Sequence, residues 1–382
     1  NDKQSYYSDI IINKLYSMRE TLLLGNNSSS LKFMVEKWLL TWRKFAWINL
    51  TFKWKRLNFV HQRLYVEHLK KITSTRNINI NKYTLSENKE MFYQWLVGFT
   101  DGDGTFSIVK SGDKWSLTYK VSQNTYNLRV LHFIKTQLNT GNIYIEKEGK
   151  HAHFRIRDRA TLESVIFPIF DKYSLLTTKQ FNYIKFKKAH NILSNTLLSK
   201  IEKDTLINKI IKTKPNNVPL EAGEKVYISP IWSIINNEPS NFYLASKVMS
   251  KPWLVGFTEA EGSFYLVAKS SNRLVHGFEI TQKLDKIVLI AIKHLLGIST
   301  NVKTTRLGTY SIVSTNSRAI ENIIKYFNNT MKGMKSLEYR IWSRSYNKHK
   351  GDFMALEKIR NQVRVMKKNK YTLLDMNYKM KE

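Results

Sequence analysis

WLVGFTDGDGTF, from Trp95 to Phe106, and WLVGFTEAEGSF, from Trp253 to Phe264, are two copies of one motif that lie 158 positions apart. Each copy ends in acidic residues followed by glycine, and the last acids are Asp103 and Glu261. If the two copies pack against each other, these acids lie side by side. Paired carboxylates of this kind bind divalent cations and support metal-assisted hydrolysis of phosphodiesters.

The spacing of small residues indicates how the copies pack. Gly98 lies four residues before Gly102, and Gly256 lies four residues before Ala260. Residues four apart share one face of a helix. We therefore expect two helices whose faces of small residues allow a close approach.

The composition indicates what the acids face. The chain has 62 Lys+Arg against 30 Asp+Glu, a formal net charge of +32, which makes a polyanion the expected partner and nucleic acid the leading one. No apolar run approaches the roughly 18 residues of a membrane-spanning helix, so we expect no membrane partner. The opening residues, NDKQSYY, show no hydrophobic leader. The absence of Cys excludes disulfides and thiolate metal sites.

The repeat is longer than the motif. Gln123 and Gln282 each close an alternating run, 159 positions apart. Farther along, Lys179 and Lys335 begin similar segments, KQFNYIKF and KSLEYRIW, 156 positions apart. Because these anchors agree with the spacing of the motif to within three residues, the chain contains two matching halves.

Each half has the same expected order of elements. Alternating runs predict half-buried strands, and apolar residues at helical spacing predict helices. The expected strands are 105–111, 116–123, 142–147 and 153–158, then 263–270, 274–282, 301–306 and 309–314; the expected helices after the motifs include 128–138 and 160–170, then 287–296 and 318–327. The predicted fold is α+β, with two pseudo-symmetric halves, each an antiparallel four-stranded sheet backed by helices.

The remaining segments set the boundaries. We expect a basic, Trp-rich helical N-terminal extension at 1–90, a first repeat at 91–195, an interdomain linker at 196–251, a second repeat at 252–350, and a basic C-terminal helix and tail at 351–382. The linker holds four of the six prolines, with a helix expected around Ile201 to Ile211.

The extension allows two interpretations. It has 16 Lys+Arg against 7 Asp+Glu, with tryptophans interleaved among the basic residues. Its Trp face either docks on the core or stacks on RNA bases. The candidate nucleic-acid contacts are Trp42, Arg43, Lys44, Lys53, Lys55 and Arg56.

The two motifs resemble those of the LAGLIDADG homing endonucleases and the related RNA maturases encoded in group I introns. The resemblance covers about Phe92 to Lys350 and implies an αββαββα unit in each half. It further implies that Asp103 and Glu261 bind a divalent cation, Mg²⁺, and that Gln123 and Gln282 lie near it. Lys179 and Lys335 match the segment of a catalytic-pocket lysine, although Thr177 aligns about as well.

Strand parity predicts which residues face the nucleic acid. The expected open face of the first sheet carries several hydrogen-bond donors: Ser107, Ser116, Thr118, Lys120, His153, Arg155 and Arg157. The expected open face of the second sheet carries few: Tyr265, Val267, Lys269, Val275, Gly277, Glu279, Ser311 and Val313. The candidate contacts are Lys120, Arg155, Arg157 and Lys269. A sheet with few donors suits direct readout of bases poorly.

This asymmetry favours an RNA maturase, which binds group I intron RNA and assists its splicing without hydrolysis, with DNA endonuclease activity retained as an option. The alternative is an active Mg²⁺-dependent homing endonuclease that breaks both strands of duplex DNA. A third class is a regulator of the same fold without catalysis. The resemblance implies a monomer, a mitochondrial location that also fits the A+T-biased composition, and a second splicing protein as an optional partner.

Overall fold

The computed structural model describes residues 78–215, 218–219, 225–306 and 308–368. The six contacts expected in the N-terminal extension, at positions 42, 43, 44, 53, 55 and 56, lie outside the described residues. The first motif helix, α4 (Ile78–Asp103), begins earlier than the expected boundary at residue 91. The described residues after Asn79 belong to one compact unit, which contains both repeats.

The first half is built around one antiparallel sheet in the order β1-β2-β4-β3. Its strands are β1 (Gly104–Ser111), β2 (Lys114–Asn124), β3 (Asn142–Ile145) and β4 (His151–Ile156). Its helices after α4 are α5 (Leu128–Leu138), α6 (Arg159–Thr161), α7 (Phe167–Lys172) and α8 (Lys179–Ser194), with the short turns η1 (Thr125–Asn127) and η2 (Leu162–Ile166). The expected helix at 160–170 is thus divided by the wide turn η2, since Pro168 lacks the N–H that a continuous helix would use.

The second half repeats this plan, with the order β7-β8-β10-β9. Its motif helix is α11 (Lys251–Glu261), and its strands are β7 (Gly262–Ser270), β8 (Arg273–Lys283), β9 (Lys303–Arg306) and β10 (Thr309–Ser314). Its other helices are α12 (Lys286–Leu296), α13 (Ser317–Phe327) and α14 (Lys335–His349). The predicted α+β fold with two pseudo-symmetric halves is confirmed.

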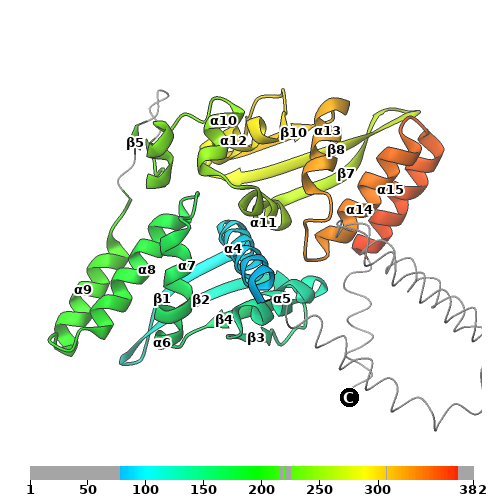
Figure 1. Cartoon of the computed structure of the whole chain (residues 1–382). Helices are drawn as coiled ribbons and strands as arrows, with labels where there is room; N and C mark the ends of the chain where they lie inside the picture. The colour runs from blue at the N-terminus through cyan, green and yellow to red at the C-terminus, as the bar shows by residue number, and fades with distance from the viewer. Residues whose placement is uncertain (1–77, 216–217, 220–224, 307, 369–382) are drawn as a thin grey trace, which may run out of the picture. The chain divides into compact units, whose positions relative to one another are not determined.

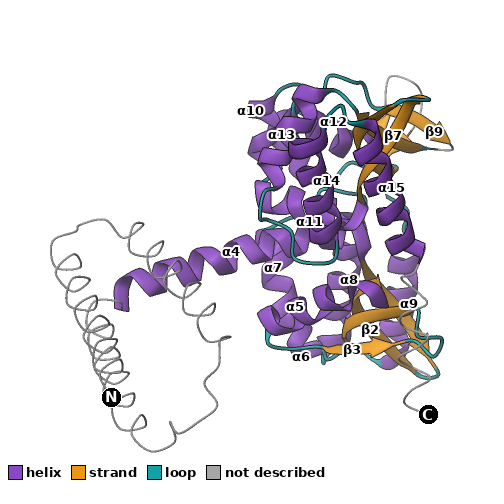
Figure 2. Ribbon diagram, turned by 90° about the vertical axis from the view of Figure 1, so that its right-hand side faces the viewer, coloured by secondary structure: helices purple, strands orange, loops and turns teal. Residues whose placement is uncertain are grey.

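The motif helices lie side by side between the two sheets (Figure 1). The strands of both halves lie on one side, with α5, α11 and α13 on the other (Figure 2). Alternate strand residues such as Phe106, Tyr119 and Phe154 are buried beneath the first sheet, and Phe264 and Phe278 beneath the second. Each sheet therefore turns one face to the core and leaves the other open.

The segment between the halves is largely built into the fold. The helix expected at Ile201 to Ile211 is α9 (Lys200–Lys212), and it begins with a capping box formed by Ser199 and Glu202. After the short pair β5 (Val218–Pro219) and β6 (Lys225–Val226) come η3 (Pro230–Ile235) and α10 (Phe242–Val248). Trp232 is fully buried and donates to the carbonyl of Leu176 at 2.9 Å, which fixes η3 against the first half.

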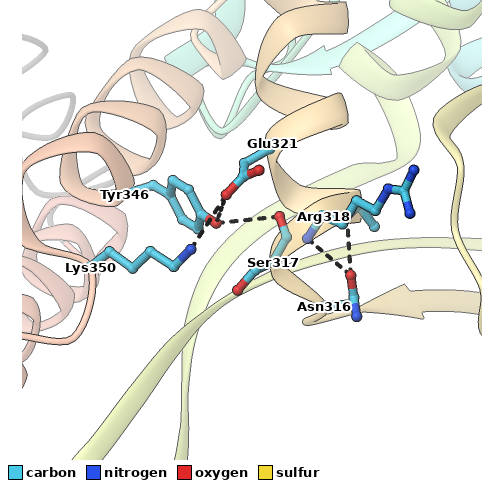
Figure 3. A network of polar contacts seen from close by, with 7 residues as sticks. Asn316, Ser317, Arg318, Glu321, Tyr346 and Lys350 are labelled. Atoms are coloured by element: carbon cyan, nitrogen blue, oxygen red, sulfur yellow. Dashed lines mark hydrogen bonds and ion pairs between the residues drawn. The ribbon is translucent and has the colours of Figure 1, made fainter.

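Helices α13 and α14 are joined by a polar network (Figure 3). Asn316 caps α13 by accepting from the backbone N–H of Arg318 at 3.0 Å. The Tyr346 hydroxyl donates to Glu321 at 2.8 Å, and Lys350 forms an ion pair with the same carboxylate at 3.4 Å. These contacts hold α14, the helix that begins with Lys335, against the rest of the second half.

After α14, the chain forms α15 (Phe353–Lys368), which packs on α14 and on the sheet through β7 and β8. None of the helices in the described ranges combines the length and the apolar character needed to cross a membrane.

Candidate metal and nucleic-acid site

The two motif helices touch at their glycines. A Cβ atom on Gly98 would overlap the backbone carbonyl of Trp253, and one on Gly256 would overlap the carbonyl of Trp95. One turn later, a Cβ on Gly102 would overlap the side chain of Ala260. The predicted close approach of the small-residue faces is therefore confirmed.

This crossing brings the last acids of the two helices together. Asp103 ends α4 and Glu261 ends α11, and each is followed at once by the first strand of its half. A Cβ on Gly102 would lie 3.6 Å from Oε1 of Glu261, so the carboxylate of one helix reaches the end of the other. The two carboxylates thus belong to one site.

The electrostatics of the two acids fit a cation. Burial raises the pKa of Asp103, against the opposing effects of the Gln123 hydrogen bond and of nearby lysines. Burial also raises the pKa of Glu261, and the negative charge of Asp103 raises it further. Two partly buried carboxylates that repel each other gain from a divalent cation between or beside them.

The donor set consists of carboxylate oxygens, which hard divalent cations prefer. Within the described ranges no group of three or more His, Asp or Glu side chains is placed to hold a metal. Mg²⁺ is characteristically held by one or two carboxylates, with water and substrate phosphate oxygens completing its coordination. Asp103 and Glu261 match that pattern and would hold such an ion.

The glutamines predicted near the site occupy matching positions in the sheets. Val121 pairs with Gly104, the residue after the first motif helix, and Gln123 lies two positions after Val121. In the same way, Ile280 pairs with Gly262, and Gln282 lies two positions after Ile280. The Nε2 of Gln123 donates to Asp103. The Nε2 of Gln282 donates instead to Asp285 at 3.1 Å.

The lysines predicted in the pocket also reach the motif ends. Lys179 donates to the backbone carbonyls of Thr100, at 3.0 Å, and of Gly102. Lys335 donates to the carbonyl of Gly262 at 2.7 Å. Burial lowers the pKa of Lys179, while the surrounding carboxylates, Asp101 first, oppose that effect.

Thr177, the other candidate for the lysine position, lies elsewhere. It is fully buried, and its hydroxyl donates to Asp101 rather than facing Asp103. Of the two alignments, the one through Lys179 brings a charged group to the motif end.

Asp101 and Glu259 lie two residues before the last acids, and each accepts hydrogen bonds from the other motif helix and from a loop before a helix. Trp253 of the second motif donates through its indole N–H to Asp101 at 2.9 Å, and Trp95 of the first motif donates to Glu259 at 2.9 Å. Each acid is therefore bonded to the tryptophan of the other helix. Burial raises the pKa of Asp101 to about 6 and also raises that of Glu259.

The same two acids hold the loops that lead to the lysines. Asp101 accepts from the backbone N–H of Leu176 at 2.8 Å, and Glu259 accepts from that of Lys332 at 2.8 Å. Helices α8 and α14, with Lys179 and Lys335 at their starts, follow within three residues. Acids at these positions also suit the positive ends of the helix dipoles.

The open face of the first sheet has the predicted parity. Ser107 pairs with Thr118, and Lys120 pairs with Arg155. Tyr119 and Ile156, which alternate with them, are buried; Thr118 is buried as well, whereas the other three are partly exposed. Arg157 has the same parity but lies just after the end of β4.

Tyr144 of β3 belongs to the same open face and was not foreseen. It pairs with His153 across β3 and β4, and the two rings are stacked with centroids 5.7 Å apart. The guanidinium of Arg155 lies over the Tyr144 ring at 3.7 Å, a cation–π contact that fixes its orientation.

The second open face is richer in donors than the sequence indicated. The predicted parity holds for Tyr265, Val267, Val275, Gly277, Glu279, Ser311 and Val313. The pairing adds polar residues to that face: Ser263, Thr281, Lys283, Lys303 and Thr309. The expectation of a face nearly bare of donors was wrong, because it omitted the end of β8 and all of β9.

Two further details alter the expected contacts of this sheet. The register of β7 shifts between Ala268 and Ser270, so strand pairing does not assign Lys269 to a face. Glu279 accepts a hydrogen bond from the phenol of Tyr265. Burial raises the pKa of that phenol, and the negative charge of Glu279 raises it further.

Comparison with known proteins agrees with this geometry. The family model for LAGLIDADG endonucleases matches residues 96–190 and again 254–346. A Schizosaccharomyces pombe protein described as the probable intron-encoded endonuclease Cox1-I1b is 40% identical over 298 residues, which cover 75% of this chain and 72% of that protein. The uncharacterized mitochondrial protein RF1 of Saccharomyces cerevisiae is 34% identical over 56% of this chain and 40% of its own length.

Solved structures share the fold at lower identity. The I-SmaMI LAGLIDADG homing endonuclease bound to cleaved DNA superimposes with a TM-score of 0.56 at 24% identity, over 70% of this chain and 94% of that one. I-GzeII in complex with its DNA target superimposes with a TM-score of 0.53 at 24% identity, over 70% of this chain and 96% of that one. A structure of I-SmaMI bound to uncleaved DNA in the presence of calcium ions has a TM-score of 0.56 at 24% identity, over 70% of this chain and 96% of that one.

Proposed function

The chain belongs to the LAGLIDADG endonuclease family, and we propose that it is a Mg²⁺-dependent endonuclease that cuts both strands of a specific duplex DNA. The observation that carries the proposal is the convergence of Asp103 and Glu261, one from each half, at the crossing of the two motif helices. A double-strand break requires two such acids, since each scissile phosphate needs its own activated water.

The reaction assigns a task to each side chain. Asp103 and Glu261 would each hold a divalent cation, which would supply activated water and neutralise charge on the phosphate of one strand. Lys179 and Lys335, positioned at the motif ends, would stabilise negative charge that develops on phosphate and leaving oxygens. Gln123 orients the Asp103 carboxylate by donating to it.

Target binding would use the two open faces. Arg155, held over Tyr144, presents a forked donor suited to guanine, and Lys120 beside it suits phosphate or base acceptors. In the second half, Lys283 and Lys303 would neutralise backbone phosphates. Because both sheets carry donors on their open faces, the asymmetry between the sheets no longer favours RNA over DNA.

The test uses plasmid DNA that carries the exon junction without its intron, incubated with the full chain and Mg²⁺. We expect a double-strand break at one site, lost on addition of a chelator. The variant Asp103→Asn/Glu261→Gln should not cut, whereas Glu238→Gln, which removes an exposed acid of the linker, should cut normally. The absence of cleavage at the junction by the unaltered chain rejects the proposal.

Assistance of group I intron splicing is a second candidate function, supported by the net charge of +32, since folded RNA is recognised largely through its shape and its charged backbone. The self-splicing rate of the intron RNA at low Mg²⁺, measured with and without protein, tests it. Asp103→Asn/Glu261→Gln should retain the acceleration, because the role is non-hydrolytic. No acceleration and no salt-sensitive binding would reject this function.

We also propose that the protein works as a monomer, since its two repeats already supply both halves of the site. A mitochondrial location is supported by the description of the relative RF1 as a mitochondrial protein. A second splicing protein remains an optional partner for the RNA function.

A further inference from the structure

One pair of residues differs in chemistry where the two halves otherwise correspond. Asn127 and Asp285 lie 158 positions apart, the spacing of the motif. Each accepts a backbone N–H from the opposite half. Met334 donates to Oδ1 of Asn127 at 2.8 Å, and Thr178 donates to Oδ1 of Asp285 at 2.7 Å.

In the first half, Asn127 determines the direction of a glutamine. Its Oδ1 is engaged by Met334, so its amide group donates through Nδ2 to Oε1 of Gln123 at 2.8 Å. The Nε2 of Gln123 is then the group that donates to Asp103. An amide N–H therefore faces the carboxylate of the first half.

In the second half, Asp285 reverses that direction. An ionised carboxylate only accepts hydrogen bonds, so Gln282 presents its Nε2 to Asp285, at 3.1 Å. Among the described residues, Gln282 makes no hydrogen bond to Glu261. The carbonyl end of the Gln282 amide is the end that Asp285 does not engage.

We propose that Asn127 and Asp285 are positioning residues that turn the amides of Gln123 and Gln282 in opposite senses, so that the two halves hold divalent cations with unequal strength. The inference rests on the proposed metal-dependent function. An N–H that donates to Asp103 competes with a cation for the carboxylate oxygens. With its Nε2 held by Asp285, Gln282 would turn its carbonyl oxygen toward the Glu261 site, and a carbonyl oxygen is a ligand that hard cations accept, so we expect the second half to bind the cation more tightly.

The proposal is tested by titrating the full chain with Mn²⁺ and measuring the free ion by electron paramagnetic resonance. The titration is done at about pH 8, where carboxylates are normally ionised. Asp285→Asn keeps the acceptor for Thr178 and adds a donor toward Gln282. We expect it to weaken the tighter site by about tenfold, the scale of effects from residues that orient metal ligands. Asn127→Asp should strengthen the weaker site.

Single-site backgrounds assign each effect. With Asp103→Asn, only the Glu261 position remains, and adding Asp285→Asn should weaken it. With Glu261→Gln, adding Asp285→Asn should change nothing. Circular dichroism shows whether each variant folds, and the opposite directions of the two swaps separate positioning from a general loss of structure.

The outcomes distinguish the inference from the function on which it rests. Unchanged Mn²⁺ isotherms in both swaps overturn the inference while the nuclease proposal stands. No Mn²⁺ binding by the unaltered chain overturns both. In plasmid cleavage with each strand labelled, the double variant Asn127→Asp/Asp285→Asn should reverse which strand is cut first, and an unchanged order would also overturn the inference.

Discussion

The indole N–H of Trp95 in the first half donates to the carboxylate of Glu259 in the second half at 2.9 Å. Trp253 returns the same bond to Asp101 at 2.9 Å. Because both acids are buried and also bind the loops before α8 and α14, the crossing of the motif helices and the placement of Lys179 and Lys335 depend on one set of contacts.

Replacing Trp95 by Phe should therefore cost stability as well as activity. The ring remains, but buried Glu259 loses a donor, which costs about 1–3 kcal/mol. Urea unfolding measures the loss. The matched variant Trp253→Phe should show a similar loss through Asp101, and stability equal to that of the unaltered chain in both variants would contradict this account.

The glycines of the crossing allow a harsher test. Gly98→Ala places a methyl group against the backbone carbonyl of Trp253, so the helices must separate. We expect a destabilisation of about 1–3 kcal/mol or more, as for overpacked cores, together with loss of DNA cutting. Gly112→Ala offers a contrast, since a Cβ there meets nothing within 4 Å, although its positive φ of 55° adds backbone strain. A Gly98→Ala variant no less stable than Gly112→Ala would contradict the close packing.

Much of this arrangement could be predicted from the sequence because it repeats. The helix expected at 128–138 and the strand expected at 309–314 have the observed bounds. Glycines at helical spacing predicted the crossing, and the glutamine and lysine anchors predicted which residues approach the motif ends.

The remainder depends on contacts between distant segments. The bond from Trp95 to Glu259 exists only at the particular crossing of α4 and α11, and nothing near either residue indicates it. Likewise, Lys303 joins the open face only through its pairing with Ser311 in another strand. Local patterns predicted the elements, whereas these partners are set by packing and register.

A difference between the halves yields a stabilising substitution. The Thr100 and Tyr119 hydroxyls are hydrogen-bonded at 2.8 Å in the first half. The corresponding residues are Thr258 and Phe278, and the buried hydroxyl of Thr258 has no hydrogen-bond partner within the described part of the chain. Phe278→Tyr supplies the missing hydroxyl.

We expect Phe278→Tyr to stabilise the protein by about 1 kcal/mol, the net value of a typical buried hydrogen bond. Thermal unfolding measures the gain. The reciprocal variant Tyr119→Phe should destabilise the protein, since it leaves the hydroxyl of Thr100 without the bond to Tyr119 that it now has. A destabilised Phe278→Tyr would mean that the packing around Phe278 has no room for the added oxygen.

The buried carboxyl of Asp285 predicts a pH dependence of stability. Burial raises its pKa from 3.8 to about 7, against hydrogen bonds from Gln282 and Thr178, and the charge of Asp101 adds to the rise. Compared with the unfolded chain, the folded state therefore binds the proton of Asp285 more tightly, although the carboxyl still ionises above about pH 7. The stabilising effect of this raised pKa is fully present below pH 3.8 and is lost as the pH rises through about 7.

The Asn side chain of Asp285→Asn stays neutral at every pH. The stability of this variant relative to the unaltered chain should therefore increase as the pH rises across that window. A pKa that moves from 3.8 to about 7 on folding changes the free energy of unfolding by at most roughly 4 kcal/mol across the window. Free energies of unfolding from urea titrations, at pH values on both sides of the window, measure the difference. Glu238→Gln controls for removing an exposed negative charge. If the stability difference between Asp285→Asn and the unaltered chain is the same at both pH values, the carboxyl does not titrate with folding.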